Sequence, residues 1–207
     1  MKDIFLALAK NYAADPGLTA DLWNEIEKNY SKSNRHYHTL GHLENLLSEL
    51  NGIRDRISDW NTILFTLFYH DVIYNPLKSN NEEKSADLAG KRLRALTVPT
   101  PVIDKCKHQI LATKQHLPDP DNDTDFFTDA DLSILGQSWN VYEKYAADVR
   151  KEYSIYPDLI YNPGRKKVLQ HFLEMNRIFK TEYFFNKYET AARHNLQKEI
   201  QQQGFTR

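Results

Sequence analysis

The sequence predicts an all-α fold, a bundle of about nine to ten helices, from three observations. Apolar residues recur at helical spacing along the 207 residues, whereas the apolar–polar alternation of a strand is hard to find. Hydrophobic residues make up 41% of the chain, which is enough for a core. The seven glycines are scattered and form no Gly-x-Gly pair, so the sequence shows no glycine-rich phosphate loop.

Five helices are predicted in the N-terminal half. The segment "ADPG" closes the first, and Ser58 with Asp59 is typical of the N-cap of the fourth. The fourth is apolar on most of its faces, so we expect it to be buried. The predicted ranges are Lys2 to Ala13, Ala20 to Lys32, about Leu40 to Ile53, Trp60 to Ile73, and from "NPLKSNN" to Leu96.

Five more helices are predicted in the C-terminal half. Thr100 and Pro101 form a cap and first-turn pair, and "KQHLPDPDNDTDFFT" is the only long polar loop. After it, "DADLSILG" predicts a short helix that stops at Gly136. The remaining predicted ranges are Thr100 to about Thr113, Trp139 to Tyr156, Arg165 to Phe179, and Glu182 to Gln203.

Composition and charge narrow the class of protein. Lys and Arg (27) nearly balance Asp and Glu (28), and a net charge of −1 gives no support for binding a nucleic-acid polymer or an anionic membrane. The single cysteine, Cys106, rules out an internal disulfide. No run of eighteen apolar residues occurs, so no membrane-spanning helix is predicted. We expect one domain over residues 1–207, in a cytoplasmic protein.

The segment "LFTLFYHDVIYNP" places His70 and Asp71 at the end of the most apolar predicted helix. Burying such groups is costly unless they are paired or bind a metal. A hydrogen-bonded His–Asp pair that caps the helix would be one solution. A shared metal ion would be another.

Three histidines cluster in "RHYHTLGH". His38 and His42 are four residues apart and share a face of a helix, a spacing that can hold zinc. Thr39 stands where a zinc protease carries its general-base glutamate, so a protease of that kind is excluded. For this pair alone, a polar helix start with satisfied histidines is an equally good interpretation.

Two acids, Asp129 and Asp131, precede the apolar residues of "DADLSILG". Carboxylates are favourable in the first turn of a helix, so capping accounts for one of them. The other is available for a different role.

These segments give the order His42, His70–Asp71, Asp131, with each segment on a different predicted helix. The pattern resembles the HD superfamily of metal-dependent phosphohydrolases, whose signature is His…His-Asp…Asp on an all-helical domain. The segments "HLENLL", "FTLFYHDVIY" and "DADLSILG" are similar to its three ligand-bearing elements. The segments "NNEEKSA" and "ILATKQH" further resemble an uncharacterised bacterial branch of that superfamily.

The resemblance covers about residues 35–150 and leaves 1–34 and 151–207 as flanking helices. It implies that Asp131, rather than Asp129, is the last metal ligand. Two imidazoles and two carboxylates suit a divalent ion of Mn, Fe, Co, Ni or Zn, and Mg is also a candidate. Four protein ligands leave positions for water and substrate only at coordination number five or six, which disfavours a closed structural zinc site.

Other residues near these motifs are candidates for catalysis or substrate binding. Arg35 could bind phosphate and His38 could be a fifth metal ligand, with a surface arginine as the ordinary alternative. Glu82 and Glu83 open the helix after the His-Asp pair, where capping is the default role, and Glu83 is the preferred general base. Lys114 is a candidate phosphate anchor, or simply part of a solvated helix end.

Two further features bear on the metal. His108 and His116 would lie roughly 80° out of register on a helix, so we do not expect them to share one ion. By analogy with two-metal HD proteins, either could serve a second ion. The acids of "DPDNDTDFFTDAD" alternate as in a calcium loop, but the Gly and Glu that such a loop requires are missing.

The sequence therefore predicts hydrolysis of a phosphate ester, with a nucleotide or a related small phosphorylated molecule as substrate. One alternative is a regulatory or ligand-binding HD module that keeps the metal but has little hydrolase activity. A second is a di-iron HD-fold oxygenase, and a third is a purely structural helical protein without a tightly bound metal. Aromatic residues on the last predicted helices would permit a homodimer.

Overall fold

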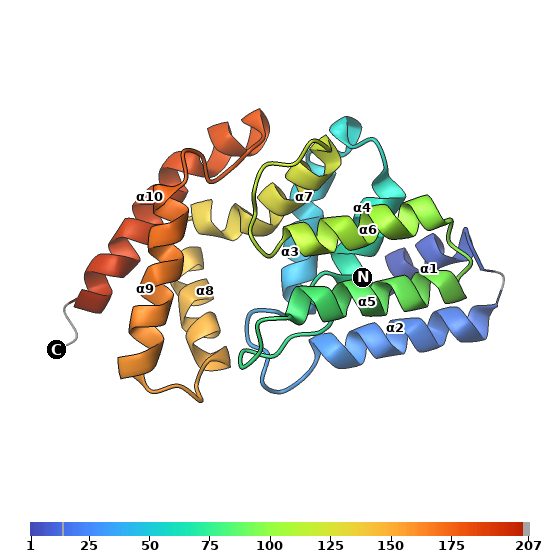
Figure 1. The fold of residues 1–207 in the computed structure, drawn as a ribbon, viewed down its shortest axis with the longest axis horizontal. Helices are drawn as coiled ribbons and strands as arrows, with labels where there is room; N and C mark the ends of the chain where they lie inside the picture. The colour runs from blue at the N-terminus through green and yellow to red at the C-terminus, as the bar shows by residue number, and fades with distance from the viewer. Residues whose placement is uncertain (14, 205–207) are drawn as a thin grey trace. The chain divides into compact units, whose positions relative to one another are not determined.

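The computed structural model describes residues 1–13 and 15–204 and confirms the all-α prediction (Figure 1). The described residues form ten α-helices, two short 3₁₀ helices and no strand. The chain divides into two compact units, Met1–Thr128 and Asp129–Arg207, which are considered one at a time. The expectation of a single domain stays a prediction.

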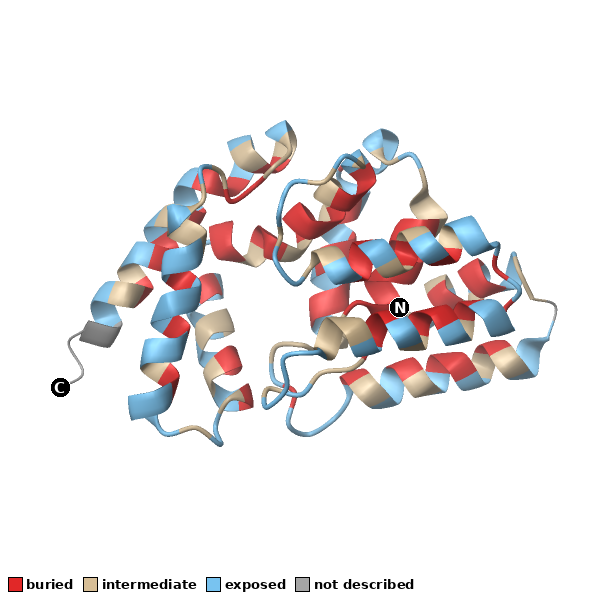
Figure 2. Cartoon of the chain, viewed as in Figure 1, coloured by how far each residue is buried: buried red, intermediate tan, exposed pale blue. Residues whose placement is uncertain are grey.

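The N-terminal unit is built around one buried helix, α4. Every residue from Thr62 to Tyr69 is buried, and Figure 2 shows this helix almost entirely in the colour of buried residues. It packs against α1, α3, α5 and α6. The unit contains α1 (Lys2–Lys10), α2 (Pro16–Tyr30), α3 (Leu40–Asn51), η1 (Arg54–Arg56), α4 (Trp60–Tyr69), α5 (Asn81–Ala95), α6 (Thr100–Ala112) and the first turns of α7 (Asn122–Leu132).

The C-terminal unit holds η2 (Ser133–Gly136), α8 (Trp139–Glu152), α9 (Asp158–Glu174) and α10 (Glu182–Gly204). The short η2 packs against α10 so closely that a Cβ at Gly136 would lie 2.5 Å from Tyr188 Cβ. Asn195 of α10 also donates hydrogen bonds to the carbonyls of Leu135 and Gln137, at 2.9 and 2.8 Å. Glycine is therefore required at this position by close packing.

Several helix ends differ from the prediction. The first, fourth and eighth helices end earlier, at Lys10, Tyr69 and Glu152. The second begins earlier, at Pro16, because the Asp15 side chain accepts hydrogen bonds from the backbone N–H groups of the first turn and proline suits that turn. Within the "ADPG" segment, Asp15 is thus the N-cap of α2 and Pro16 its first residue, whereas α1 already ends at Lys10.

Part of the predicted polar loop is helical. Helix α7 begins at Asn122, so "NDTDFFT" belongs to it and only the first half of the loop is irregular. Asp123 is 1% exposed and accepts hydrogen bonds from the backbone N–H groups of Ser58 and Asp59 and from Lys105. Acidic residues are favourable in the first turn of a helix. The polar segment that was predicted as a loop therefore includes the start of α7.

Helix α9 begins seven residues earlier than the sequence indicated, since 165 − 158 = 7, and it contains Pro163. Proline removes the hydrogen bond to the carbonyl four residues earlier, that of Leu159. Leu159 is 90% exposed, so its carbonyl can bond to water instead. The helix consequently tolerates the "NPG" segment that looked like a boundary.

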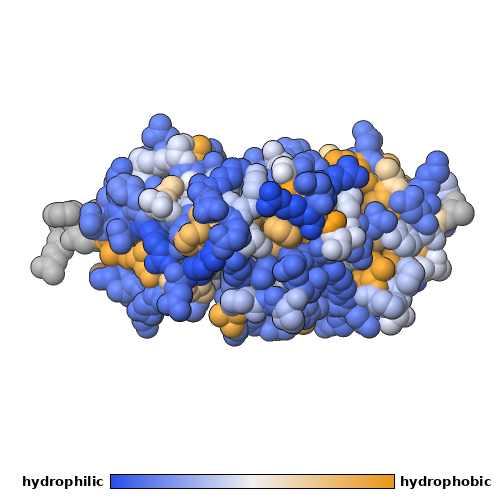
Figure 3. Space-filling model, turned by 90° about the horizontal axis from the view of Figure 1, so that it is seen from above, coloured by the Kyte–Doolittle hydropathy of each residue, from blue (hydrophilic) through white to orange (hydrophobic). Residues whose placement is uncertain are grey.

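No helix in the described part of the chain is long and apolar enough to cross a membrane. The face seen in Figure 3 is largely hydrophilic, with small separate apolar patches. The exposed large apolar side chains are Leu77, Leu111, Leu117, Val141, Ile155, Leu159, Ile160 and Val168.

Candidate metal centre

His42 lies on α3, at the start of an apolar stripe that anchors this helix. Leu43, Leu46, Leu47 and Leu50 are buried along one side of this helix. His42, one residue before the stripe, is itself only 5% exposed. Its Nε2 atom lies 3.2 Å from Nε2 of His70. The two imidazoles therefore face each other, as a shared ligand site requires.

His70 sits at the C-cap of the buried helix α4, where its backbone N–H bonds to Thr66 at 2.8 Å. Its ring Nδ1 lies 3.0 Å from the carbonyl of Leu67. A carbonyl can only accept, so Nδ1 carries the proton and the lone pair is on Nε2. A backbone carbonyl that fixes the second ring nitrogen in this way is the usual support for a metal-bound histidine.

Asp71 follows directly, in the turn after α4, and faces the same point. Its Oδ2 lies 3.2 Å from His70 Nε2 and 3.9 Å from Nε2 of both His42 and His38. Burial by itself would raise the pKa of Asp71, but the adjacent His70, with His38 and His42, outweighs it and holds the pKa below its usual range. The carboxylate is thus kept ionised, the form that binds a cation.

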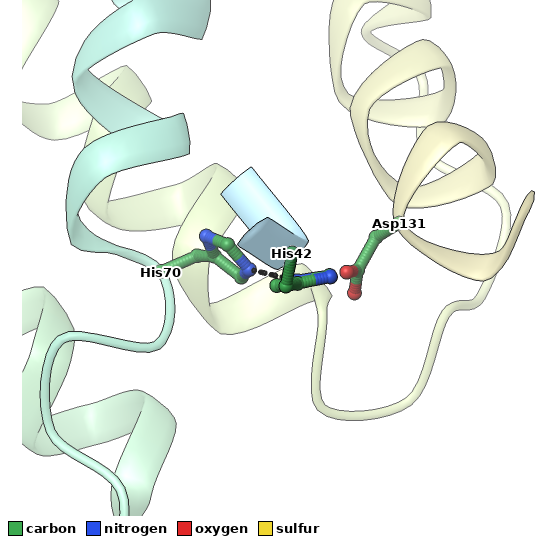
Figure 4. Close-up of side chains that lie close together, drawn as sticks. All are labelled: His42, His70 and Asp131. Carbon is green, nitrogen blue, oxygen red and sulfur yellow. Dashed lines mark hydrogen bonds between the residues drawn. The ribbon is translucent and has the colours of Figure 1, made fainter. Parts of the chain in front are cut away.

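Asp131 is the third member of a group with His42 and His70, whose ligand atoms all lie within 4.8 Å of one another. Figure 4 shows its carboxylate pointing toward the His42 ring. Asp131 belongs to α7, a continuous helix that begins within the N-terminal unit. This is the only such group among the residues that the structure describes.

Asp129 has a different role, as the sequence resemblance implied. It is fully buried and accepts hydrogen bonds from the backbone N–H groups of Lys180 and Thr181 at 2.9 and 2.7 Å. The Lys180 ammonium lies 2.9 Å from the same carboxylate, and its side chain is 4% exposed. Asp129 therefore fastens the segment before α10 to the end of α7.

His38 precedes α3 and borders the group. Its ring is stacked on Tyr74 with centroids 4.2 Å apart, and 20% of its side chain is exposed. His38 Nε2 lies 3.9 Å from Asp71 Oδ2, so a small adjustment would bring the His38 ring into the donor set. Its predicted part as a fifth ligand stays a prediction.

Two of the three residues predicted for catalysis bond to each other. Lys114 forms an ion pair with Glu83 and donates to the carbonyl of Ser79 at 2.8 Å. The hydrogen bond from Lys114 lowers the pKa of Glu83, which makes it a poorer base than expected. In contrast, burial raises the pKa of the neighbouring Glu82, and Asp71 adds to this rise. The pKa values of these two neighbouring acids are therefore shifted in opposite directions.

Arg35, the third candidate, is directed at the backbone. It is 5% exposed, and its guanidinium donates to the carbonyls of His38, Asp71 and Val72. These contacts do not favour the predicted role in binding phosphate, because a buried guanidinium engaged with three carbonyls has little capacity for a substrate. The contacts are those of a residue that holds the site in shape.

The later histidines have other neighbours. His108 is paired with Asp119 at 2.6 Å on the surface, and His116 Nδ1 lies 3.3 Å from the carbonyl of Thr128. Neither belongs to the ligand group with His42 and His70. The acids of the loop are likewise engaged, since Lys105 pairs with both Asp121 and Asp123.

The group formed by His42, His70 and Asp131 could hold a metal ion. Ligand atoms that share an ion at about 2.1 Å are separated by about 3 Å, close to the approach between the two imidazoles. Two neutral nitrogens that face each other at 3.2 Å would repel unless a proton or a cation lay between them. Without such a partner, burying these groups at the end of α4 would be costly.

Comparisons with known proteins add no relative. No family model matches the chain, and no curated protein or solved structure matches it either. The site therefore rests on the residues of this chain.

Proposed function

We propose that this protein is a metal-dependent phosphohydrolase of the HD type, acting on a small phosphorylated molecule such as a nucleotide. The observation that carries the proposal is the approach of the two imidazoles of His42 and His70, at 3.2 Å, with Asp131 in the same ligand group and Asp71 Oδ2 at 3.2 Å from His70 Nε2. The order of these residues along an all-helical chain is that of the HD signature. Four such ligands from three separate segments are hard to explain as helix capping.

A divalent ion held by this group would polarise a phosphate oxygen and lower the pKa of a bound water. The chain's own residues would do the rest. Asp71 is kept ionised by the imidazoles around it, and His70 is held in one tautomer by the Leu67 carbonyl. Glu82 would exchange a proton with water or the leaving group, because its raised pKa brings it closer to neutral pH.

The exposure of Lys114 and the net charge of the chain support a class of substrate. The Lys114 ammonium lies 4.0 Å from Glu82 and is 37% exposed, which is open enough to meet a phosphate. The chain's net charge of −1 offers no broad basic surface for a polymer. A small phosphate monoester therefore suits the site better than nucleic acid.

The test is elemental analysis of the purified protein, followed by removal of metal and reloading with Mn, Co, Ni, Zn or Mg. Phosphate release is then measured from p-nitrophenyl phosphate and from a panel of nucleoside monophosphates. We expect one ion per chain and release that is lost in Asp71→Ala but kept in His194→Ala, an exposed histidine of α10. Release that survives Asp71→Ala unchanged would contradict the mechanism.

The same experiment separates the alternatives. Bound metal without turnover on any substrate favours the regulatory or ligand-binding module. Two irons per chain favour the oxygenase, and no bound metal favours a purely structural protein.

A further inference from the structure

The contacts of Arg35 link two segments that carry ligands. Its Nη1 atom donates to the carbonyl of His38 at 3.0 Å and to the carbonyl of Asp71 at 2.8 Å. Its Nη2 atom donates to the carbonyl of Val72 at 2.9 Å. One guanidinium therefore holds the segment before α3 against the turn after α4, although these segments are far apart in sequence.

Two tyrosines complete the arrangement. The Arg35 guanidinium lies 4.8 Å from the centroid of the Tyr30 ring and 5.5 Å from that of Tyr74. The Tyr30 hydroxyl accepts a hydrogen bond from the backbone N–H of Asp71 at 3.2 Å, and the Tyr74 ring is stacked on His38. Both neighbours of Arg35 thus touch the residues whose carbonyls it binds.

The contacts place the Arg35 guanidinium just beyond the C-terminal end of α4. This helix ends at Tyr69, and Arg35 binds the carbonyls of Asp71 and Val72 in the turn that follows it. A positive charge near a helix C-terminus is favourable because it lies at the negative end of the helix dipole. Arginine satisfies several carbonyls from one planar group, whereas lysine offers a single point of charge.

We propose that Arg35 is a positioning residue that fixes the orientation of Asp71 and His38 toward the metal group. The inference rests on the proposed metal site but not on any particular reaction. Outer partners of metal ligands commonly contribute 10–100-fold to affinity, so a clamp on two ligand-bearing segments should have an effect in that range.

The experiment measures Co²⁺ affinity of the full chain and the visible spectrum of the bound ion. We expect Arg35→Lys to weaken Co²⁺ binding by about 10-fold or more while circular dichroism stays that of the parent. Arg92→Lys is the matched control, because Arg92 also makes a two-pronged bond, to Glu25 on the surface, and should leave affinity within about 2-fold. Equal affinities for Arg35→Lys and the parent would overturn the inference.

A double-variant cycle identifies the path of the effect. If Arg35 acts through Asp71, then Arg35→Lys added to Asp71→Ala weakens Co²⁺ binding little further, and the spectrum of each single variant shifts in the same direction. Full additivity of the two losses would contradict positioning of Asp71.

A second variant keeps the inference testable if Arg35→Lys does not fold. Tyr74→Leu removes the ring that both Arg35 and His38 contact and leaves every predicted ligand in place, and we expect weaker Co²⁺ binding and an altered spectrum. Unchanged binding in Tyr74→Leu would count against the clamp. Parent protein that binds Co²⁺ but hydrolyses no phosphoester would remove the proposed function alone.

Discussion

The two units of the molecule bury polar groups in opposite ways. In the C-terminal unit, the Glu199 carboxylate is bonded by Arg165 Nε and Nη2 at 2.8 and 3.0 Å and accepts a hydrogen bond from the Tyr142 hydroxyl. All three side chains are buried, and the charges of the acid and the arginine cancel. In the N-terminal unit, the groups facing the Asp71 carboxylate are imidazoles, which carry charge only when protonated.

The two clusters differ in whether their charges are balanced within the protein, and this difference distinguishes a structural cluster from a binding site. A bidentate arginine–carboxylate pair satisfies itself and needs nothing from outside. Imidazole nitrogens and carboxylates that converge on one point share the same need for a cation. We therefore expect variants of the Arg165–Glu199 cluster to change the free energy of unfolding. Variants of the imidazole and carboxylate group around His70 should change metal binding.

The largest effect is expected for a variant that breaks the group of His42, His70 and Asp131. His70→Ala removes a ligand that is held in one tautomer, and we expect metal affinity to fall at least about 100-fold, more than for loss of an outer partner. Elemental analysis and Co²⁺ titration measure it. His194→Ala should keep the metal, and retention of metal by His70→Ala would show that the imidazoles are merely hydrogen-bonded.

The roles of the two neighbouring acids at the start of α5 can be compared directly. Glu82→Gln should lower phosphate release by about 100-fold or more, the usual contribution of a proton-transfer group. Glu83→Gln is the matched control, and because Glu83 is engaged by Lys114 we expect a smaller loss. Metal content should be unchanged in both, as measured by elemental analysis. Equal rates in the two variants would refute the assignment to Glu82.

In the C-terminal unit, Glu199→Ala leaves the buried Arg165 without its counter-charge. The expected loss is about 3–5 kcal/mol in the free energy of unfolding, measured by urea titration. Replacing both partners, as Arg165→Met with Glu199→Leu, should cost much less because no charge remains buried. Glu143→Ala, an exposed glutamate of α8, serves as control. A double variant as unstable as the single one would contradict this account.

Variants of the two aspartates of "TDADL" should differ in what they change: one the free energy of unfolding, the other metal binding. Asp129→Asn breaks the buried pair with Lys180, and we expect a loss of about 3 kcal/mol in the free energy of unfolding. Asp131→Asn should change that free energy by less than about 0.5 kcal/mol and weaken Co²⁺ binding instead. Urea titration and Co²⁺ titration on both variants measure the contrast, and a reversed result would exchange the two roles.

The smallest expected effect concerns Asp148 of α8, which is buried, whereas its two partners, Lys144 and Lys151, are exposed. Burial works against ionisation of Asp148, but hydrogen bonds from Lys144 and Lys151 outweigh it and lower its pKa. A depressed pKa contributes stability above the unfolded value of about 3.8, and that stability is lost as the pH falls through the folded value. Asp148→Asn should therefore cost about 0.5 kcal/mol at pH 7, since both lysines are exposed, and progressively less in acid. A loss independent of pH, in urea titrations across that range, would exclude the ion pair as its cause.

Much of this could be predicted from the sequence, and the errors have physical causes. The helical class followed from apolar periodicity, which is strong where helices are buried. The grouping of His42 with His70 was predicted from the resemblance to the HD signature, not from periodicity. The start of α7 was missed because its acids are neutralised by partners far away in sequence, such as Lys105. The contacts of Arg35 and the raised pKa of Glu82 could not be predicted for a similar reason, since they depend on carbonyls and burial that no local pattern reveals.

The burial of α4 on all sides has a consequence for insertions and deletions. One residue added between Asp59 and His70 would turn everything after it by about 100° and advance it by about 1.5 Å. A surface helix could absorb that change by bulging into solvent, but α4 has other helices around it. Both His70 and Asp71 would then move away from His42. The site therefore depends on the length of this helix as well as on the identity of the ligands.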